Sequence, residues 1–367
     1  MNATVDLIAG ARPNFMKVAP ILRAFAASGS SLRPRLVHTG QHYDPEMSDV
    51  FFQQLEIPKP DLHLGVGSGS HGAQTAKILA GYEEVLISSR PRGVIVVGDV
   101  NSTMACTLAA VKLGVPVAHV EAGLRSLDRT MPEEINRLVT DCLADVLLVS
   151  DPSGQEHLKR EGVDAAKVEF VGNVMIDTLV QQLPKAKATN VIQQVGFSPG
   201  NYIYVTLHRP SNVDDPQRCK TLLQSLEECG QRLPLVFPIH PRTRGRLSEF
   251  GFLAQLEANP RFKLLPPQGY LESLALMSSA RAVITDSGGI QEESSFLGIP
   301  CLTVRPNTER PVTVDLGTST IVGDRLPELP ALVDAIIAGS YKKGQPIPGW
   351  DGHAAERVVS ILSKRWG

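Results

Sequence analysis

Short apolar runs alternate with longer stretches of helical periodicity along the chain of 367 residues. The first half contains TVDLIAG, RPRLVHTG, GVIVVGD, PVAHVEA, DVLLVS and KVEFVGN, and the second half contains YIYVTLH, LPLVFPIH, RFKLLP, RAVITD, PCLTVR and STIVG. These runs are almost continuously apolar, as expected of strands that are buried on both faces. Repeated β-α units of this kind predict parallel sheets covered by helices, and therefore an α/β fold.

Helices are predicted over 15–27, 73–88, 102–113, 133–142, 153–161, 215–231, 270–279, 288–298 and 352–365. The rhythm changes at 184–200, where Pro, Gly, Lys and polar residues predict a linker or domain edge. The chain length also favours two domains. We therefore expect two doubly wound domains, residues 1–183 and 184–351, followed by a final helix at about 352–367.

The composition indicates an ordinary globular enzyme. At 43% hydrophobic, 20% charged and a net charge of −2, the chain has no electrostatic field that would attract a nucleic acid. Five scattered cysteines and the absence of CxxC or HExxH patterns predict neither disulfides nor a bound metal. No secretory signal is evident and no apolar run reaches the ~20 residues of a membrane span, so we expect a cytoplasmic protein.

Polar residues follow nearly every predicted strand, which is where ligands bind in doubly wound sheets. This set comprises Arg12, Gln41, His42, Asp99, Glu121, His208, His240, Asp286 and Ser287. Each position alone is weak evidence, because strand ends are turns and turns are polar. Together they predict a ligand site in each domain.

The stretch 286–311 has the features of a phosphate site. Ser287 is a good helix N-cap, and Gly288 and Gly289 leave the backbone amides of the helix start accessible to an anion. Glu293 follows about a turn and a half later, a spacing that suits the hydroxyls of a ribose. The alternative is an ordinary strand-to-helix turn with a good cap.

Arg12 and Lys17 lie at the start of a predicted helix, where a cation opposes the helix dipole, and this suggests an anion held by both. His208 and His240 follow strands and could transfer protons near neutral pH. Surface or structural roles for these four side chains remain open at this point.

Three carboxylates, Asp99, Glu121 and Glu133, fall near strand ends of the first domain. A cluster of carboxylates suits general acid and base chemistry, because neighbouring negative charges raise the pKa of each group. For Glu134 we favour the simpler role of complementing the positive N-terminus of its helix.

Seven motifs occur in one order: GARPNFMKVAP, TGQHYD, GDVNST, HVEAGLRS, PEEINR, VTLHRPSN and SGGIQEE. In this respect the chain, from about residue 5 to about residue 323, resembles the non-hydrolysing UDP-N-acetylglucosamine 2-epimerases. The resemblance implies a GT-B-like fold, in which two Rossmann-like domains face each other across a cleft and the C-terminal helix returns to the first domain. It also implies a homodimer that interconverts UDP-GlcNAc and UDP-ManNAc through 2-acetamidoglucal, with no cofactor or metal.

The resemblance assigns catalytic roles to Asp99, Glu121, Glu133 and His208. The implied substrate-binding residues are Arg12, Lys17, Gln41, His42, Arg125, Arg209, His240, Tyr270, Ser287, Gly288, Gly289, Glu293 and Arg310.

Three positions depart from the family pattern. Many relatives have Glu at the position of Asn14, a carboxylate at Ser211 and Arg at Tyr43. The last region binds a second, activating UDP-GlcNAc in those relatives. We therefore expect allosteric activation to be weak or absent in this chain.

Three other functions fit the same residues. The chain could be a GT-B glycosyltransferase, a hydrolysing epimerase that releases ManNAc, or an epimerase for another UDP-sugar such as a diacetamido uronate. The crowded carboxylates of the first domain argue against the glycosyltransferase.

Overall fold

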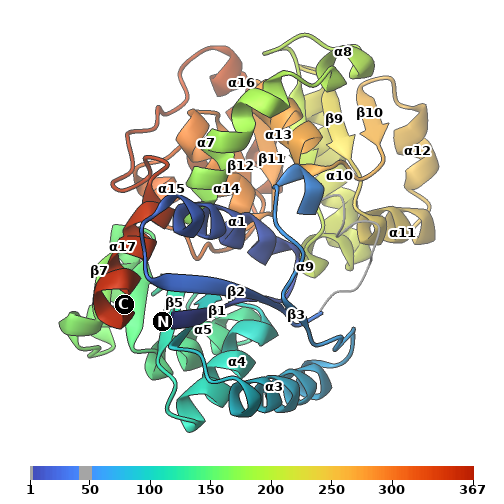
Figure 1. The fold of residues 1–367 in the computed structure, drawn as a ribbon. Coiled ribbons are helices and arrows are strands. Elements are labelled where there is room, and N and C mark those ends of the chain that lie inside the picture. The colour runs from blue at the N-terminus through green and yellow to red at the C-terminus, as the bar shows by residue number, and fades with distance from the viewer. Residues whose placement is uncertain (1–2, 41–51) are drawn as a thin grey trace. The chain divides into compact units, whose positions relative to one another are not determined.

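Strands and helices alternate along the chain in the computed structural model, which describes residues 3–40 and 52–367. The chain folds as two units (Figure 1). Unit 1 comprises Met1–Gln181 and Pro348–Gly367, and unit 2 comprises Gln182–Ile347. The sequence-based divisions, after residues 183 and 351, differ from these boundaries by two and four residues.

Unit 1 contains a parallel seven-stranded sheet in the order β3-β2-β1-β4-β5-β6-β7. Its strands are β1 (Ala3–Ala9), β2 (Leu32–His38), β3 (Leu62–His63), β4 (Gly93–Val97), β5 (Val117–Ala122), β6 (Val146–Val149) and β7 (Val168–Phe170). Its helices are α1 (Arg12–Ala27), α3 (His71–Ser88), α4 (Asn101–Lys112), α5 (Pro132–Leu143), α6 (Pro152–Arg160), η1 (Ala165–Lys167) and α17 (Ala354–Trp366). The helix α7 (Val174–Lys187) begins in unit 1 and ends in unit 2.

Unit 2 contains a parallel six-stranded sheet in the order β10-β9-β8-β11-β12-β13. Its strands are β8 (Ile203–Thr206), β9 (Leu235–Pro238), β10 (Phe262–Leu265), β11 (Ala282–Thr285), β12 (Cys301–Thr303) and β13 (Ser319–Ile321). Its helices are α8 (Val191–Val195), α9 (Pro210–Val213), α10 (Pro216–Gly230), α11 (Pro241–Glu249), α12 (Leu253–Ala258), α13 (Tyr270–Ser278), α14 (Gly288–Leu297), α15 (Val312–Asp315), η2 (Leu326–Glu328) and α16 (Leu329–Ile337).

Both sheets have the strand order of a Rossmann fold, in which the direction of winding reverses beside the first strand. This switch point lies between β1 and β4 in unit 1, and between β8 and β11 in unit 2. Ligands of such sheets bind beyond the carboxyl ends of the two strands that flank the switch point. The loops after these four strands are therefore where a site is expected.

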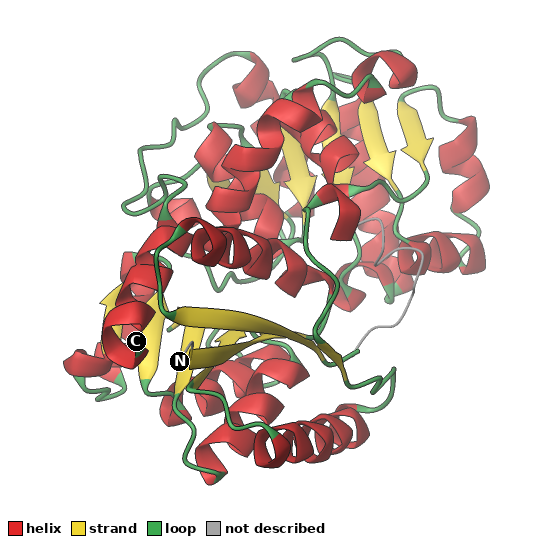
Figure 2. Ribbon diagram, in the orientation of Figure 1, coloured by secondary structure: helices red, strands yellow, loops and turns green. Residues whose placement is uncertain are grey.

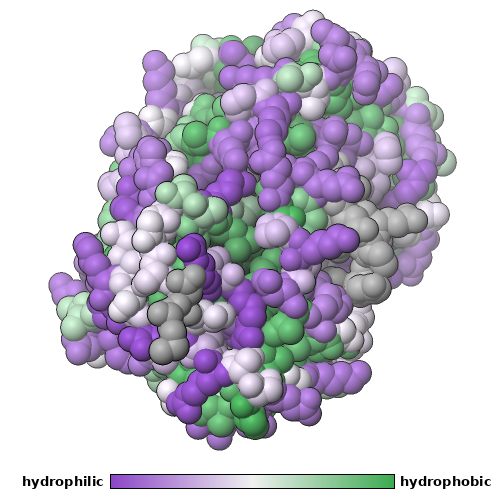
Figure 3. Space-filling view, in the orientation of Figure 1, coloured by the Kyte–Doolittle hydropathy of each residue, from purple (hydrophilic) through white to green (hydrophobic). Residues whose placement is uncertain are grey.

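The hydrophobic residues of each sheet are buried beneath helices. In unit 1, α3 and α4 cover one face of the sheet, and α1 with the neighbouring α17 covers the other (Figures 1 and 2). In unit 2, a second core gathers side chains of α10, α11 and α16 against the sheet. Hydrophilic side chains are widespread on the face shown in Figure 3. No helix in the described part of the chain is long and apolar enough to cross a membrane.

The predicted α/β fold with two doubly wound sheets is confirmed, and each of the twelve predicted strands is present. The two-residue strand β3 was not predicted, because its alternating sequence carries no apolar run. The stretch 184–200 was predicted as a linker, but it contains the end of α7 and all of α8. Pro184 suggested a break, yet the helix continues through it because buried side chains such as Leu179 hold α7 in place.

Candidate functional site

The turn after β1 is fixed by a buried asparagine. Asn14 Oδ1 accepts hydrogen bonds from the amides of Gly10 and Ala11 at 2.9 and 3.0 Å. Its Nδ2 donates to the carbonyl oxygen of Val97, at the end of β4, at 3.0 Å. A glutamate at this position could not donate that last bond, so the amide of Asn14 is what ties together the two strands of the switch point.

Glu121 lies at a β-bulge, where the register of β5 against β6 shifts between Val120 and Ala122. Its φ of 77° is in the left-handed region, which is strained for a residue with a side chain. Its carboxylate forms an ion pair with Lys17 from α1, and both side chains are almost fully buried. Bulges near strand ends redirect side chains, and this one aims Glu121 at the cation.

Gly98 makes room for that cation. A Cβ on Gly98 would lie 2.7 Å from Lys17 Nζ, which is closer than Cβ atoms approach non-bonded neighbours in proteins. Gly98 also has a φ of 67°, which favours glycine. The ammonium of Lys17 therefore lies against the turn that leads into Asp99, as well as against Glu121.

Asp99 has its own buried cation. Arg137 Nη2 donates to Asp99 Oδ2 at 2.5 Å, and Arg137 Nη1 donates to Glu134 at 2.9 Å. Glu134 is buried and also accepts hydrogen bonds from the amides of Ser126 and Leu127, so it fixes the loop before α5 rather than serving the helix dipole alone. Glu133 lies half-buried in the first turn of α5.

Arg125 was predicted to bind substrate, but its guanidinium group is paired with two carboxylates of the protein. Nε and Nη2 donate to the two carboxylate oxygens of Glu161, each at 2.7 Å, and Nη1 donates to Asp141 at 2.7 Å. The residue is 3% exposed. This geometry argues against a substrate-binding role, because an incoming ligand would have to replace two carboxylates.

In unit 2, Asp286 organises the switch point. Its fully buried carboxylate accepts hydrogen bonds from the amides of His208 and Arg209 and from Asn212 Nδ2, at 2.9 to 3.1 Å. His208 Nδ1 lies 3.2 Å from the same carboxylate. Burial lowers the pKa of His208, and the negative charge of Asp286 partly offsets that effect. His208 thus lies partly exposed beside a fixed anion.

Two further residues near this loop are His240, at the start of α11, and Ser211, in α9. His240 is exposed, accepts a hydrogen bond from the Arg242 amide at 3.2 Å and caps α11. Its ring centroid lies 5.6 Å from that of His208. Ser211 is exposed, and it is the next residue, Asn212, that links the loop to Asp286.

The start of α14 has the predicted phosphate-site geometry with one difference. Ser287 occupies the N-cap position, but its side chain makes no capping hydrogen bond. Gly288 and Gly289 are the first two helical residues. A Cβ on Gly288 would lie 2.6 Å from Nη1 of Arg310, so glycine allows the guanidinium to approach the helix start.

Arg310 and its neighbours form a buried charged cluster. Arg310 Nε lies 2.6 Å from Glu292, and Arg310 Nη1 donates to Glu309 at 2.6 Å. Arg305 Nη2 lies 2.8 Å from the other oxygen of Glu309. Arg305 and Arg310 are 4% and 6% exposed, so the cluster sets a fixed arrangement of charge next to α14.

Glu293 is buried beside Tyr270, whose hydroxyl donates to Glu293 Oε1 at 2.9 Å. Burial raises the pKa of Glu293 to about 7, with a further increase from the charge of Glu292 and an opposing effect from the Tyr270 hydrogen bond. Burial also raises the pKa of the Tyr270 hydroxyl well above its usual value.

Comparisons with known proteins identify the family of this chain. Residues 26–363 match the family model described as UDP-N-acetylglucosamine 2-epimerase. The chain belongs to the UDP-N-acetylglucosamine 2-epimerase family, whose members are isomerases.

This chain has nearly the same sequence identity to two curated relatives that are named for different UDP-sugars. It is 40% identical to the UDP-N-acetylglucosamine 2-epimerase of Methanocaldococcus jannaschii over 364 residues, 98% of each chain. It is 39% identical to the UDP-2,3-diacetamido-2,3-dideoxy-D-glucuronate 2-epimerase of Pseudomonas aeruginosa over 361 residues, 97% of this chain and 98% of the relative. The crystal structure of the M. jannaschii enzyme in complex with UDP-GlcNAc and UDP matches with a TM-score of 0.90, covering 98% of this chain and 99% of that one.

The structure does not describe every predicted site residue, and it shows site residues whose role the sequence did not predict. Gln41 and His42 lie outside the described residues, and so does the side chain of Arg12, which opens α1. Arg137 was not predicted as a site residue, and Asp286 was noted as a strand-end residue without an assigned role. Arg137 could have been found from its spacing of four from Glu133, which places both on one side of α5.

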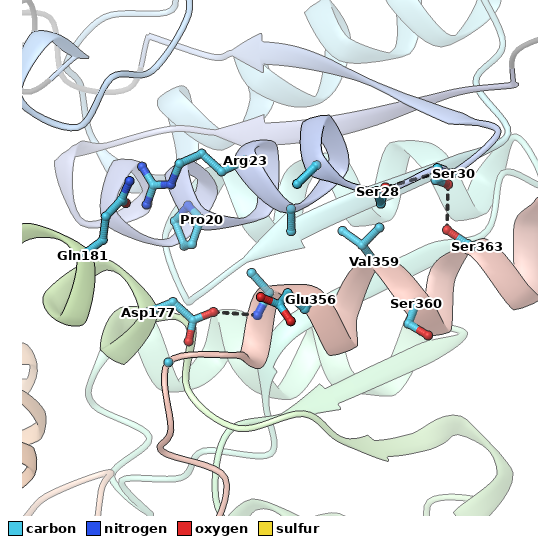
Figure 4. A pocket seen from close by; sticks show the side chains of 15 residues that line it. Pro20, Arg23, Ser28, Ser30, Asp177, Gln181, Glu356, Val359, Ser360 and Ser363 are labelled. Carbon is cyan, nitrogen blue, oxygen red and sulfur yellow. Dashed lines mark hydrogen bonds between the residues drawn. The ribbon is translucent and has the colours of Figure 1, made fainter.

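A groove of about 710 Å³ lies along α1 and α17 in unit 1 of the epimerase (Figure 4). Arg23, Asp177 and Ser363 are among its lining residues. Asp177 accepts hydrogen bonds from the first amides of α17 at 3.1 and 2.7 Å, so its carboxylate serves the fold. Within residues 3–40 and 52–367, none of the predicted site residues lines this groove.

Proposed function

We propose that this epimerase interconverts UDP-GlcNAc and UDP-ManNAc by inverting C2 of the sugar. The observation that carries the proposal is the placement of Asp99 and Glu121 at adjacent strand ends, each with a buried cation against it. The name and the ligands of the M. jannaschii enzyme support this choice of substrate. The route proposed below, elimination and re-addition of UDP, includes no hydride transfer and so calls for no redox cofactor.

The chemistry requires more than a simple proton exchange. The C2 proton of the sugar is not next to a carbonyl group, so its direct removal would be slow. In the proposed route, a base removes this proton while the C1–O bond to UDP breaks, which gives 2-acetamidoglucal. UDP then adds back to C1 as an acid delivers a proton to the opposite face of C2.

Unit 1 supplies the proton transfer in this proposal. Asp99, Glu121 and Glu133 are the acid and base groups, and Lys17 and Arg137 hold the first two in place. A carboxylate that is fixed by a buried cation loses no energy to reorganisation when the reaction occurs. The strained backbone of Glu121 supports its assignment, since strain of this kind concentrates at active sites.

Unit 2 holds the nucleotide in this proposal. The Ser287 side chain, the amides of Gly288 and Gly289 and the ring of His208 receive the diphosphate, which carries the negative charge that develops on the leaving group. Arg209 and His240 add positive or polar groups near this end of the sheet, and Arg310, which Glu292 and Glu309 hold, adds its charge beside the start of α14 without contacting the ligand. Glu293 accepts the ribose hydroxyls.

A reaction in D2O followed by NMR tests the function. UDP-GlcNAc should acquire deuterium at C2 and yield a mixture of two UDP-sugars. Asp99→Asn and Glu121→Gln should each lower the rate of exchange by at least about 10²-fold, as expected when a general acid or base is lost. No exchange by the unmodified protein would refute the proposal, and free ManNAc in place of UDP-ManNAc would assign a hydrolysing enzyme.

A second candidate substrate is supported by the name of another relative of nearly equal identity. The relative named UDP-2,3-diacetamido-2,3-dideoxy-D-glucuronate 2-epimerase is 39% identical, against 40% for the UDP-GlcNAc enzyme. Measuring kcat/KM for both UDP-sugars under the same conditions separates the two candidates. A ratio above about 10² in favour of the uronate would assign the chain to that substrate.

We further propose that the enzyme works as a cytoplasmic homodimer and that UDP-GlcNAc activates it weakly or not at all. The family resemblance supports the first point, and Tyr43 in place of the relatives' Arg supports the second. Light scattering measures the mass in solution. Initial rates from UDP-ManNAc, with and without trace UDP-GlcNAc, measure the activation, and a large increase would contradict the proposal.

A further inference from the structure

His119 is a fully buried histidine in β5, two residues before Glu121. Its Nδ1 lies 2.6 Å from Oδ1 of Asp141, and its Nε2 lies 2.8 Å from the carbonyl oxygen of Gly98. Neither distance leaves room for water. The ring is therefore held on both sides by atoms of the protein.

Both of these partners are acceptors. A carbonyl oxygen has no proton to give, so Nε2 must donate to Gly98. Asp141 Oδ2 accepts further hydrogen bonds from Arg125 Nη1 at 2.7 Å and from the Gly123 amide at 3.0 Å. These donors favour an ionised carboxylate, to which Nδ1 must also donate. Burial alone would raise the pKa of Asp141, but the charges and hydrogen bonds of His119 and Arg125 hold it below its usual value.

The partners of this pair belong to the two turns that carry the carboxylates. Gly98 directly precedes Asp99, and Gly123 follows Glu121 by two residues. The Gly98 amide also donates to the carbonyl oxygen of Val120 at 3.1 Å. A bulged, left-handed Glu121 persists only if its surroundings over-determine its backbone, and the pair of His119 and Asp141 supplies such a restraint.

We propose that His119 and Asp141 are positioning residues that lock the ends of β4 and β5, with the His119 ring protonated on both nitrogens. This inference rests on the proposed roles of Asp99 and Glu121. The imidazolium links the carbonyl before Asp99 to the carboxylate that holds the turn after Glu121. Neither His119 nor Asp141 touches the substrate.

Steady-state kinetics test the positioning role. Asp141→Asn keeps the shape of the side chain and removes its charge, and His119→Gln removes one of the two donors. Each should lower kcat by about 10²-fold, the cost of misplacing catalytic groups by about 1 Å. KM for UDP-GlcNAc and the Kd for UDP should change less than about twofold, because the proposed nucleotide site lies in unit 2.

Glu161→Gln is the matched control. It breaks the outer ion pair of Arg125 while leaving His119, Asp141 and both turns in place. We expect a lower Tm with kcat within about twofold of the unmodified enzyme. A purely structural cluster would instead reduce kcat in all three variants in proportion to the loss of Tm, and that result would overturn the proposal. So would an Asp141→Asn enzyme with full kcat.

Protonation of the ring is measured without any assay of activity. In protein labelled with 15N-histidine, His119 should give two ring N–H signals at neutral pH, assigned by their loss in His119→Gln. A single ring N–H signal would overturn the doubly donating ring. If the signals appear but the unmodified protein exchanges no C2 proton of UDP-GlcNAc, the proposed function fails while the buried imidazolium stands.

Discussion

At the scale of single residues, the site depends on charges that are buried in pairs. Lys17 and Glu121 are 5% and 4% exposed and form one such pair. Removing one partner of a buried pair leaves the other charge without compensation, which typically costs about 3–5 kcal/mol. Removing both partners costs less than the sum of the two single losses.

A double-mutant cycle should reveal this coupling. Lys17→Met and Glu121→Gln should each lower the free energy of unfolding by about 3 kcal/mol, and the double variant should recover a large part of the loss. Denaturant titrations of the four proteins measure it. Additive single effects below about 1 kcal/mol each would mean that the pair is solvated.

Glu293 predicts a dependence of stability on pH. Its pKa rises to about 7 in the folded protein, so between about pH 4.5 and 7 the folded state binds more protons than the unfolded state. Stability from this group is therefore lost as the pH rises through that window. A shift of this size corresponds to about 3 kcal/mol.

The variant Glu293→Gln should lack this loss. Its free energy of unfolding, minus that of the unmodified protein, should rise by about 2–3 kcal/mol from pH 4.5 to 7.5. Tyr270→Phe removes the hydrogen bond that opposes the shift, so it should move the window to higher pH. A difference that stays flat with pH would show that Glu293 is ionised throughout.

At the scale of elements, the start of α14 allows an effect on ligand binding to be measured apart from an effect on stability. An N-cap side chain normally stabilises its helix by about 1 kcal/mol, but the side chain of Ser287 makes no capping bond. Ser287→Ala should therefore change the free energy of unfolding by less than about 0.5 kcal/mol. Any loss of UDP affinity in this variant would then report a contact with the ligand.

Gly288→Ala is the complementary change. The added methyl group would meet the guanidinium of Arg310, which Glu292 and Glu309 hold in place. We expect at least a tenfold weaker binding of UDP, about 1.4 kcal/mol, measured by calorimetry. Unchanged affinity would mean that this turn does not hold the phosphates.

The sequence predicted the strands better than the helices, since α7, α11 and α16 are among the helices that it missed. Strands buried on both faces, such as Gly93–Val97, leave an apolar run that needs no knowledge of the fold. α7 was missed because its stability comes from packing, which no local pattern records. The bulge at Glu121 was also hidden, since it depends on the register of β5 against β6.

The same limit applies to the site. Strand-end position and motif order were enough to single out Asp99, Glu121 and Ser287 from the sequence. They could not show that Arg125 is occupied by Asp141 and Glu161, because those residues are 16 and 36 positions away along the chain. Partners of this kind are chosen by tertiary packing, so they become visible only in the structure.

At the scale of the whole molecule, each unit has a core of its own, so stability and ligand binding should respond separately in the two. Trp366 of α17 is buried against Gly93 of unit 1, where a Cβ would lie 2.6 Å from its ring. Trp366→Ala should destabilise unit 1 by about 3–5 kcal/mol, as the loss of a large buried ring does. Hydrogen exchange of the amides should then accelerate in β1, β4 and α17.

Adding UDP to both proteins completes the test. The ligand should slow amide exchange at 207–212 and 286–293 in unit 2, in the Trp366→Ala variant as in the unmodified protein, because the proposed nucleotide site draws on unit 2 alone. Protection centred on unit 1, or its loss in the variant, would contradict this division. The division has a chemical reason: the uridine part of the substrate takes no part in the bond changes, so its site can remain rigid while proton transfer depends on the strained backbone at Glu121 in unit 1.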